Sequence, residues 1–110
     1  MVRNSKGSRR ERELLSLFSK NGFVVHRVAG SGKGEDAICD LIAIDKNGKV
    51  SLIEVKSRKN VYYTKDDISQ LNELINYAKK CNSKPILAVK LNYKDWQFFD
   101  LTKGIPEKVE

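Results

Sequence analysis

Two apolar segments joined by a tight turn constrain the fold of this chain most. Residues 37–44 and 49–56 are apolar for most of their length, and Asp45-Lys46-Asn47-Gly48 separates them. An Asn-Gly pair between two such segments is typical of the turn that joins antiparallel strands. The two segments are therefore predicted to form a β-hairpin.

The register of this hairpin decides which polar side chains meet. Side chains alternate along a strand, so Glu54 and Lys56 share one face of the second strand and Val55 lies on the other. If the loop is 46–48, Asp40 lies directly across from Glu54, whereas a two-residue Asn-Gly loop would turn Asp40 to the opposite face. The first register is preferred because it leaves no carboxylate in the core.

A helix and a strand are predicted before the hairpin. Ser8 is the expected N-cap of the helix, and Glu11, three residues later, completes a capping box. The helix should run to about Lys20, where Asn21-Gly22 ends it. Residues 23–28 are rich in β-branched and aromatic side chains, which favours a strand.

A helix and two strands are predicted after the hairpin. Thr64 is a second candidate cap, and apolar residues then recur at helical spacing up to Lys80. Residues 86–91 and 96–99 are the two strands, and the first is so evenly apolar that it should lie inside the sheet. The order α-β-β-β-α-β-β predicts an α/β (α+β) fold with a mixed five-stranded sheet flanked by helices.

Length and charge indicate one domain with a polyanionic partner. We expect a single domain over residues 1–110, with poorly ordered ends at 1–7 and 103–110. The chain has 21 Lys and Arg against 14 Asp and Glu, a net charge of +7. Nucleic acid explains this charge better than a membrane does, because no apolar run approaches the roughly 18 residues of a membrane span. The N-terminus lacks the apolar core of a signal peptide, so we expect a cytoplasmic protein, or an intracellular one if a virus encodes it.

Carboxylates are the expected metal ligands. The chain has one histidine and two cysteines, and Cys39 and Cys81 lack the CxxC spacing of a zinc site. Asp40 and Glu54 would repel each other unless a cation lay between them, and oxygen ligands suit Mg²⁺ or Mn²⁺. Such an ion can bind a phosphate oxygen and lower the pKa of a bound water, while Lys56 orients that water or stabilises the developing charge. The alternative is an ordinary ion pair at a strand end.

Glu11 lies on the inward face of the first predicted helix. At helical spacing it shares the apolar stripe of Leu14, Leu15 and Phe18. A carboxylate on an inward face indicates a third member of the acidic cluster. The alternative is that Glu11 serves only the capping box.

Four segments carry a resemblance to a known family, in order and with matching spacing over about residues 5–100. They are Lys6–Arg12, Gly30–Gly32, Ile38–Ala43 and Leu52–Lys59. Together they resemble the archaeal-type Holliday junction resolvases of the PD-(D/E)xK nuclease superfamily, with Cys39 where the superfamily motif has Pro. The resemblance implies a restriction-endonuclease-like fold and a Mg²⁺-dependent homodimer that nicks two opposed strands of a four-way DNA junction.

The resemblance also implies roles for individual residues. Glu11, Asp40 and Glu54 match the acidic metal-site positions, and Lys56 matches the catalytic lysine. Val55 would offer its backbone carbonyl to the metal.

Two further positions match the family, each with a simpler alternative. Ser31 matches a serine in the loop near the scissile phosphate, although it can also be a flexible filler in a Gly-rich loop. Gln70 resembles a glutamine found in many of these nucleases, although it can also be an ordinary exposed side chain. Basic residues around these positions are expected to contact DNA phosphates: Arg9, Arg10, Arg12, Lys33, Arg58, Lys59 and Lys65.

Two other functions stay open at this point. One is a nicking or repair endonuclease of the same superfamily that acts on flaps, mismatches or plain duplex. The other is a non-catalytic nucleic-acid-binding dimer whose carboxylates form only structural ion pairs. The surface of the expected homodimer is also open between the second helix with Tyr77 and the last strand with Trp96 and Phe98.

Overall fold

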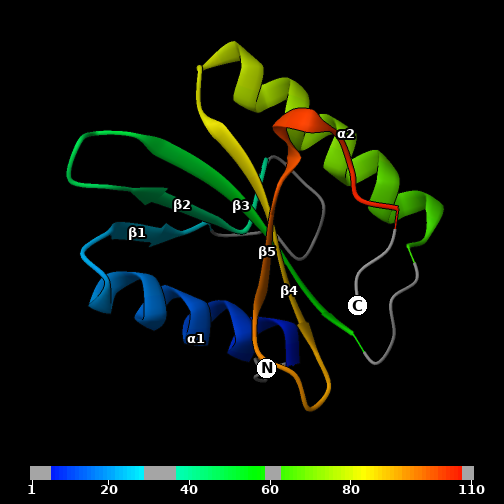
Figure 1. Cartoon of the computed structure of the whole chain (residues 1–110), viewed down its shortest axis with the longest axis horizontal. Coiled ribbons are helices and arrows are strands. Elements are labelled where there is room, and N and C mark those ends of the chain that lie inside the picture. The colour runs from blue at the N-terminus through cyan, green and yellow to red at the C-terminus, as the bar shows by residue number, and fades with distance from the viewer. Residues whose placement is uncertain (1–5, 29–36, 59–62, 108–110) are drawn as a thin grey trace.

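One five-stranded sheet lies between two helices in this computed structural model, which describes residues 6–28, 37–58 and 63–107 (Figure 1). The elements in chain order are α1 (Lys6–Lys20), β1 (Val24–Arg27), β2 (Leu41–Ile44), β3 (Val50–Arg58), α2 (Lys65–Lys80), β4 (Lys84–Leu91), β5 (Gln97–Asp100) and the 3₁₀ helix η2 (Leu101–Lys103). The predicted order of helices and strands is confirmed. No helix among the described residues has the length and apolarity to cross a membrane.

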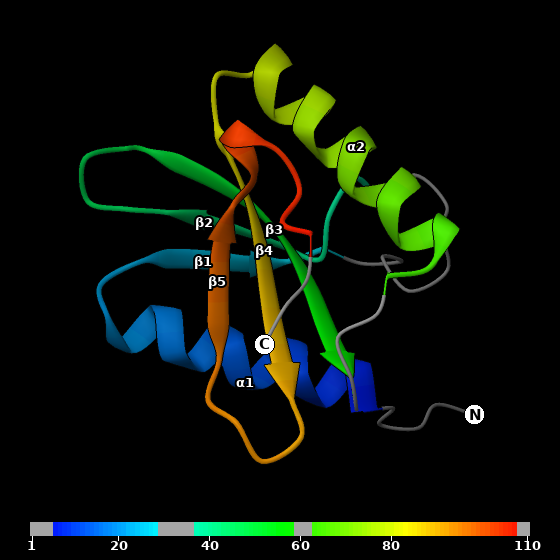
Figure 2. The same cartoon turned by 45° about the vertical axis from the view of Figure 1, so that its right-hand side comes forward.

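The strands lie in chain order across the sheet; β3 and β4 pair in parallel, and the other three neighbouring pairs are antiparallel. The connection through α2 carries the chain back to the end of the sheet where β3 began, so β4 runs beside β3 in the same direction (Figure 2). The sheet is therefore mixed, as predicted, and β4 is an interior strand.

The hairpin between β2 and β3 has the preferred register. Leu41 pairs with Ile53, and the Asp45 N–H donates to the Lys49 carbonyl at 3.0 Å, which leaves 46–48 as the loop. Gly48 ends the loop with a φ of +80°, a conformation that glycine adopts without strain. The three-residue loop is confirmed.

The first helix begins earlier than predicted. It starts at Lys6, so Ser8 lies inside the helix and is not its N-cap. The capping box with Glu11 was therefore wrong, because the Glu11 carboxylate bonds to Arg27 on β1 instead of folding back on the helix backbone. The predicted end is confirmed, since Gly22 has a φ of +90° and the Phe23 N–H donates to the Phe18 carbonyl at 3.1 Å.

The core consists of two apolar clusters on opposite faces of the sheet. The cluster under α1 contains Leu14, Leu41, Ala43, Ile53, Val55 and Ala88. The cluster under α2 contains Cys39, Leu52, Leu71, Leu74, Ala78, Leu87, Val89, Leu91 and Leu101. Because β3 and β4 contribute to both clusters in alternation, these two strands are fixed from both sides.

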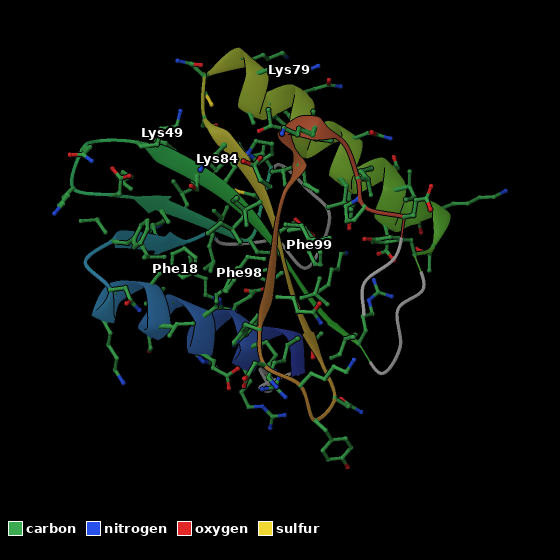
Figure 3. The ribbon with its side chains drawn as sticks, viewed as in Figure 1. Phe18, Lys49, Lys79, Lys84, Phe98 and Phe99 are labelled. Atoms are coloured by element: carbon green, nitrogen blue, oxygen red, sulfur yellow. The ribbon has the colours of Figure 1, made fainter. Side chains whose placement is uncertain are left out.

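Aromatic side chains of β5, the edge strand, pack on both faces of the sheet. Phe98 lies against Phe18 of α1 with ring centroids 5.8 Å apart, while Phe99 packs on the α2 face (Figure 3). Beyond β5, Leu101 is fully buried and Ile105 packs against the α2 cluster. We predicted a poorly ordered tail over 103–110, but residues 103–107 lie in the described part of the fold.

Strands β3 and β4 are longer than predicted. β3 continues past Lys56 to Arg58, where it still pairs with Leu91 of β4. β4 begins at Lys84, so Pro85 lies near the start of a strand, where a missing N–H is tolerated. The extension of β3 matters for the site, because it keeps Lys56 and Arg58 on a strand paired to β4.

Candidate active site

Strand β3 divides its side chains between the two helices as predicted. Val55 packs in the cluster under α1, whereas Lys56 reaches α2 on the other face and donates to Gln70 Oε1 at 2.7 Å. Glu54 lies on the same side as Lys56, with 3.5 Å between Oε2 and the lysine Nζ. The alternation of this strand therefore presents a carboxylate and an ammonium together.

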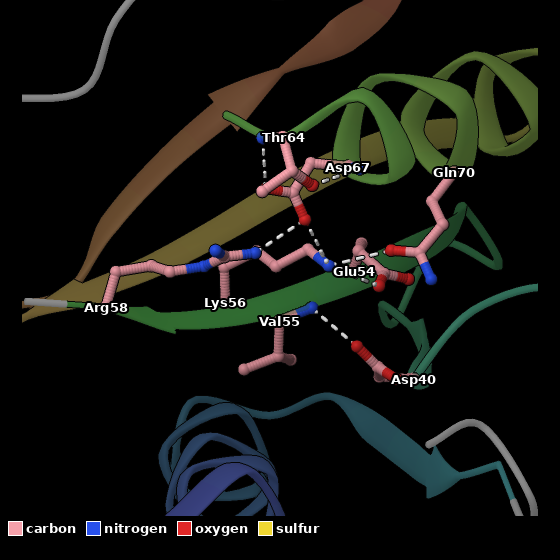
Figure 4. A network of polar contacts seen from close by, with 8 residues as sticks. All are labelled: Asp40, Glu54, Val55, Lys56, Arg58, Thr64, Asp67 and Gln70. Carbon is pink, nitrogen blue, oxygen red and sulfur yellow. Dashed lines mark hydrogen bonds and ion pairs between the residues drawn. The ribbon is translucent and has the colours of Figure 1, made fainter. Parts of the chain in front are cut away.

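Asp40 is bonded to β3 on both sides of Glu54. Its backbone N–H donates to the Ile53 carbonyl at 3.0 Å, and its Oδ2 accepts the Val55 N–H at 2.7 Å (Figure 4). Because Ile53 is already the partner of Leu41, two residues of one strand oppose one of the other, which is the arrangement of a β-bulge. The regular ladder thus ends at Leu41, and β2 is shorter than the predicted 37–44. The prediction that Asp40 lies directly across from Glu54 is therefore wrong, because the bulge takes Asp40 out of the ladder. Its backbone and side chain instead bond Ile53 and Val55, the residues on either side of Glu54.

Asp40 is buried and Glu54 is partly buried, with 13% of the Glu54 side chain exposed, and the two carboxylates repel each other. Asp40 is only 6 % exposed. Burial raises the pKa of the Glu54 carboxyl from its usual 4.5 to about 7, the Asp40 carboxylate adds to the rise, and Lys56 opposes it. Two carboxylates with one ammonium beside them have the donor chemistry of a cation site.

Glu11 faces the core, as predicted. It is 9 % exposed, and its Oε1 accepts a hydrogen bond from Arg27 Nε at 2.8 Å. Burial raises the pKa of the Glu11 carboxyl; the bond from Arg27 acts against this rise, and the Asp40 carboxylate adds to it. Glu11 thus belongs to the same electrostatic environment as the acidic pair.

Sequence reasoning missed Arg27. A usable signal was present, because Arg27 follows Phe23 and Val25 at two-residue spacing. It therefore shares their face of the strand, and both of these residues pack in the α1 cluster. A cation on that inward face needs an anion, and Glu11 of α1 is the anion that the fold provides.

The three acidic residues do not form one set of ligands. Within residues 6–28, 37–58 and 63–107, no three His, Cys, Asp or Glu side chains are gathered closely enough to hold a metal ion. The structure brings Asp40 and Glu54 to neighbouring positions around Val55 and leaves Glu11 bonded to Arg27.

A polar network from α2 surrounds Lys56. Besides Gln70, its Nζ lies 3.2 Å from Asp67 Oδ1, and Asp67 also bonds Arg58 (Figure 4). Gln70 is exposed, as its simpler alternative has it, but its Oε1 contacts Lys56, and its role in the site stays a prediction. Asp67 was missed, although the pattern Thr64-x-x-Asp67 places a carboxylate at the third helical position after the predicted cap.

The predicted DNA-contacting residues have different environments. Arg10 pairs with Glu13 at 3.0 Å, and Arg58 pairs with Asp67 at 2.5 Å. Arg9 and Lys65 are exposed. Arg12 is close enough to oppose the rise in the pKa of Glu11. Three predicted residues lie outside the described part of the chain: Ser31, Lys33 and Lys59.

Comparison with known proteins identifies relatives along nearly the whole chain. The chain is 41% identical over 98 residues to the crossover junction endodeoxyribonuclease Hjc of Archaeoglobus fulgidus, covering 86% of this chain and 68% of that protein. Against the same enzyme of Sulfurisphaera tokodaii, identity is 41% over 91 residues, which span 79% of this chain and 60% of the relative. The crossover junction endodeoxyribonuclease of Sulfolobus islandicus rod-shaped virus 1 is 33% identical over 101 residues, 89% of this chain and 83% of that protein.

The fold has a solved counterpart among these relatives. The structure of Archaeoglobus fulgidus Hjc, a Holliday junction resolvase from an archaeal hyperthermophile, matches with a TM-score of 0.69 and 36% identity. The match covers 84% of this chain and 74% of that one, so the restriction-endonuclease-like fold is confirmed. The family model of the archaeal Holliday junction resolvases (Hjc) matches residues 2–107. The chain therefore belongs to the archaeal Holliday junction resolvase family.

Proposed function

We propose that this chain is a metal-dependent endonuclease that resolves four-way DNA junctions by two symmetric nicks. The observation that carries the proposal is the arrangement around Val55, where Asp40, Glu54 and Lys56 converge within one bulged hairpin. An ordinary surface ion pair would not place a buried carboxylate near a second, partly buried one, because their repulsion has to be offset.

We propose that a divalent cation offsets this repulsion. Asp40 and Glu54 would bind it, and the Val55 carbonyl would assist, because the C=O and N–H of a strand residue leave the strand on the same side. Glu11 is proposed as a third ligand through the oxygen that does not bond Arg27, which requires its carboxylate to move closer to the other two, because the described residues hold no gathered set of three. We propose Mg²⁺, with Mn²⁺ as a substitute, since hard ions prefer oxygen ligands. When bound, such an ion supplies an acidified water and neutralises charge on the phosphate.

Lys56 and the basic residues are proposed to act on the DNA. The ammonium of Lys56, which contacts Glu54 and Gln70, would orient the attacking water or stabilise charge on the phosphorane. The exposed Arg9 and Lys65, with Arg58 near the end of β3, would contact the phosphate backbone.

A homodimer is proposed because one domain carries one such site, whereas resolution of a junction requires two nicks. Two sites related by a two-fold axis would match the two opposed strands of the junction. Exposed aromatic side chains lie on both surfaces considered above, with Tyr77 of α2 at 38% and Phe98 of β5 at 45% exposure.

The deciding experiment compares DNA substrates of matched sequence. Labelled four-way junction, flap and linear duplex are incubated with the protein in Mg²⁺, and parallel reactions contain EDTA. We expect paired nicks in the junction alone, and none in EDTA. Equal cleavage of flap or duplex would favour a repair endonuclease. Binding without cleavage in either Mg²⁺ or Mn²⁺ would favour the non-catalytic dimer.

A further inference from the structure

Asp67 is a buried carboxylate whose two oxygens have different partners. Oδ2 accepts the backbone N–H of Thr64 at 2.9 Å, which forms half of the capping box at the start of α2. Oδ1 faces two cations of β3, with Lys56 Nζ at 3.2 Å and Arg58 Nη2 at 2.5 Å. One side chain therefore joins the first turn of α2 to the strand that carries the proposed site.

The capping role alone does not account for this arrangement. A capping box needs one acceptor oxygen at this position, and that oxygen can stay exposed to water. Asp67 is only 4% exposed, whereas its neighbour Asp66 in the same helical turn is exposed. A buried carboxylate is stable only when it is paired. Here Oδ1, the oxygen that the capping box does not use, pairs with Lys56 and Arg58.

The partners of Asp67 favour its ionised form. Burial alone would raise the pKa of this carboxyl, but the Thr64 N–H together with Lys56 and Arg58 lowers it below its usual value. Asp67 is therefore a fixed anion beside Lys56 at neutral pH.

We propose that Asp67 is a positioning residue that holds the Lys56 ammonium beside the acidic pair. The inference rests on the proposed role of Lys56 in cleavage. A lysine has a long and flexible stem, so its ammonium needs fixed acceptors to stay in one place. Glu54, one of its acceptors, is also a proposed cation ligand, which leaves Asp67 and Gln70 as the anchors from α2.

The main test is Asp67→Asn, compared with Asp66→Asn as a matched control. Asparagine keeps an oxygen for the Thr64 N–H and replaces the charged acceptor that faces Lys56 and Arg58 with an amide NH2 group, which cannot accept from either cation. In single-turnover cleavage of a four-way junction, Asp67→Asn should be slower by about tenfold or more, because a displaced catalytic group is costly. Its junction Kd should be unchanged or lower, since a carboxylate near phosphate is removed. Asp66→Asn should cleave at the wild-type rate, and Asp67→Glu should recover most of the lost rate.

Thr64→Ala separates positioning from capping. It removes the hydroxyl that accepts the Asp67 N–H at 3.0 Å, but it keeps the Asp67 carboxylate. We expect a lower Tm with a cleavage rate near that of wild type. If Thr64→Ala slows cleavage as much as Asp67→Asn does, the cap explains the effect and the inference is overturned.

A measurement without cleavage keeps this inference distinct from the proposed function. The ¹⁵N signal of the Lys56 ammonium, recorded on the free protein, should be sharp in wild type and in Asp66→Asn. It should be lost through fast exchange with water in Asp67→Asn. An inactive wild type that shows this difference overturns the proposed function and leaves Lys56 anchored by Asp67. An unchanged signal, or equal cleavage by the two Asn variants, overturns the positioning role.

Discussion

The carboxylate of Asp40 accepts the backbone N–H of Val55 at 2.7 Å, so the strand that carries Glu54 also holds its acidic neighbour in place. This bond uses one oxygen and does not require a negative charge. Structure and charge at Asp40 can therefore be separated by a single substitution.

The substitution Asp40→Asn should abolish cleavage and leave the fold intact. The amide oxygen can still accept the Val55 N–H, while the charge needed for a divalent cation is lost. Junction binding, measured by gel shift, should be unchanged or tighter. Asp45→Asn is the control, because Asp45 also bonds backbone N–H groups but lies at the far end of β2. Cleavage by Asp40→Asn at a substantial fraction of the wild-type rate would remove Asp40 from the site.

The raised pKa of Glu54 predicts a pH dependence of stability in EDTA. The folded chain holds the proton of Glu54 up to about pH 7, whereas an unfolded chain releases it near the usual pKa of 4.5. This contribution is present in full below pH 4.5 and is lost as the pH rises through 7. Glu54→Gln lacks the dependence, so at pH 8 it should be more stable than wild type by ~2 kcal/mol.

Denaturant unfolding of wild type, Glu54→Gln and the exposed control Glu73→Gln at several pH values measures this effect. Parallel curves for wild type and Glu54→Gln would contradict it. Mg²⁺ should raise the stability of wild type at high pH, because the ion and the proton compete for the same carboxylate. The stability of Glu54→Gln should not change with Mg²⁺.

Glu11→Gln should slow cleavage by about tenfold or more, because it removes a negative charge that is proposed to help bind the cation. Glutamine can still accept the bond from Arg27, so the Tm should change little. Glu13→Gln is the matched control, since Glu13 lies on the same helix and pairs with Arg10 at the surface. A Glu11→Gln variant that cleaves as fast as Glu13→Gln would assign Glu11 to a purely structural pair with Arg27.

The hairpin could be predicted from sequence because its signals are local. The Asn-Gly pair predicts the turn but allows two registers, and the cost of turning Asp40 into the core favours the one that brings Asp40 near Glu54. The start of α1 could not be predicted in the same way. Ser8 and Glu11 match a capping box locally, but Glu11 bonds to Arg27 across 16 residues of chain, a tertiary contact that local patterns do not contain.

The partners of Lys56 on α2 could not be predicted from local patterns either. Gln70 and Asp67 lie on α2, and their approach to Lys56 depends on how that helix crosses β3 and β4. The spacing of apolar residues predicts which face of α2 is buried, but it does not give the position of the helix along the strands. For this reason the capping pattern at Thr64 was found and the second role of Asp67 was not.

The proposed dimer can be tested by mass and by surface substitution. Sedimentation at micromolar concentration should give about twice the chain mass of 12.5 kDa. Either Tyr77→Ser on α2 or Phe98→Ser on β5 should yield monomers, because both side chains are large, apolar and partly exposed. Tyr93→Ser, at a fully exposed turn residue outside both surfaces, is the control. Wild-type protein that sediments as a monomer would contradict the dimer itself.

Mixed dimers test whether each subunit cuts one strand. If two chains with one site each act on opposed strands, a dimer of wild-type and Asp40→Asn chains has a single working site. On a four-way junction in supercoiled plasmid it should therefore give nicked circles, whereas wild-type dimers give linear product by cutting both strands before the junction dissociates. Differently tagged chains, purified through both tags, provide the mixed dimer, and a doubly tagged wild-type dimer controls for the tags. Linear product from the mixed dimer at the wild-type rate would mean that one site makes both cuts, and the proposal of paired symmetric nicks would then have to be abandoned.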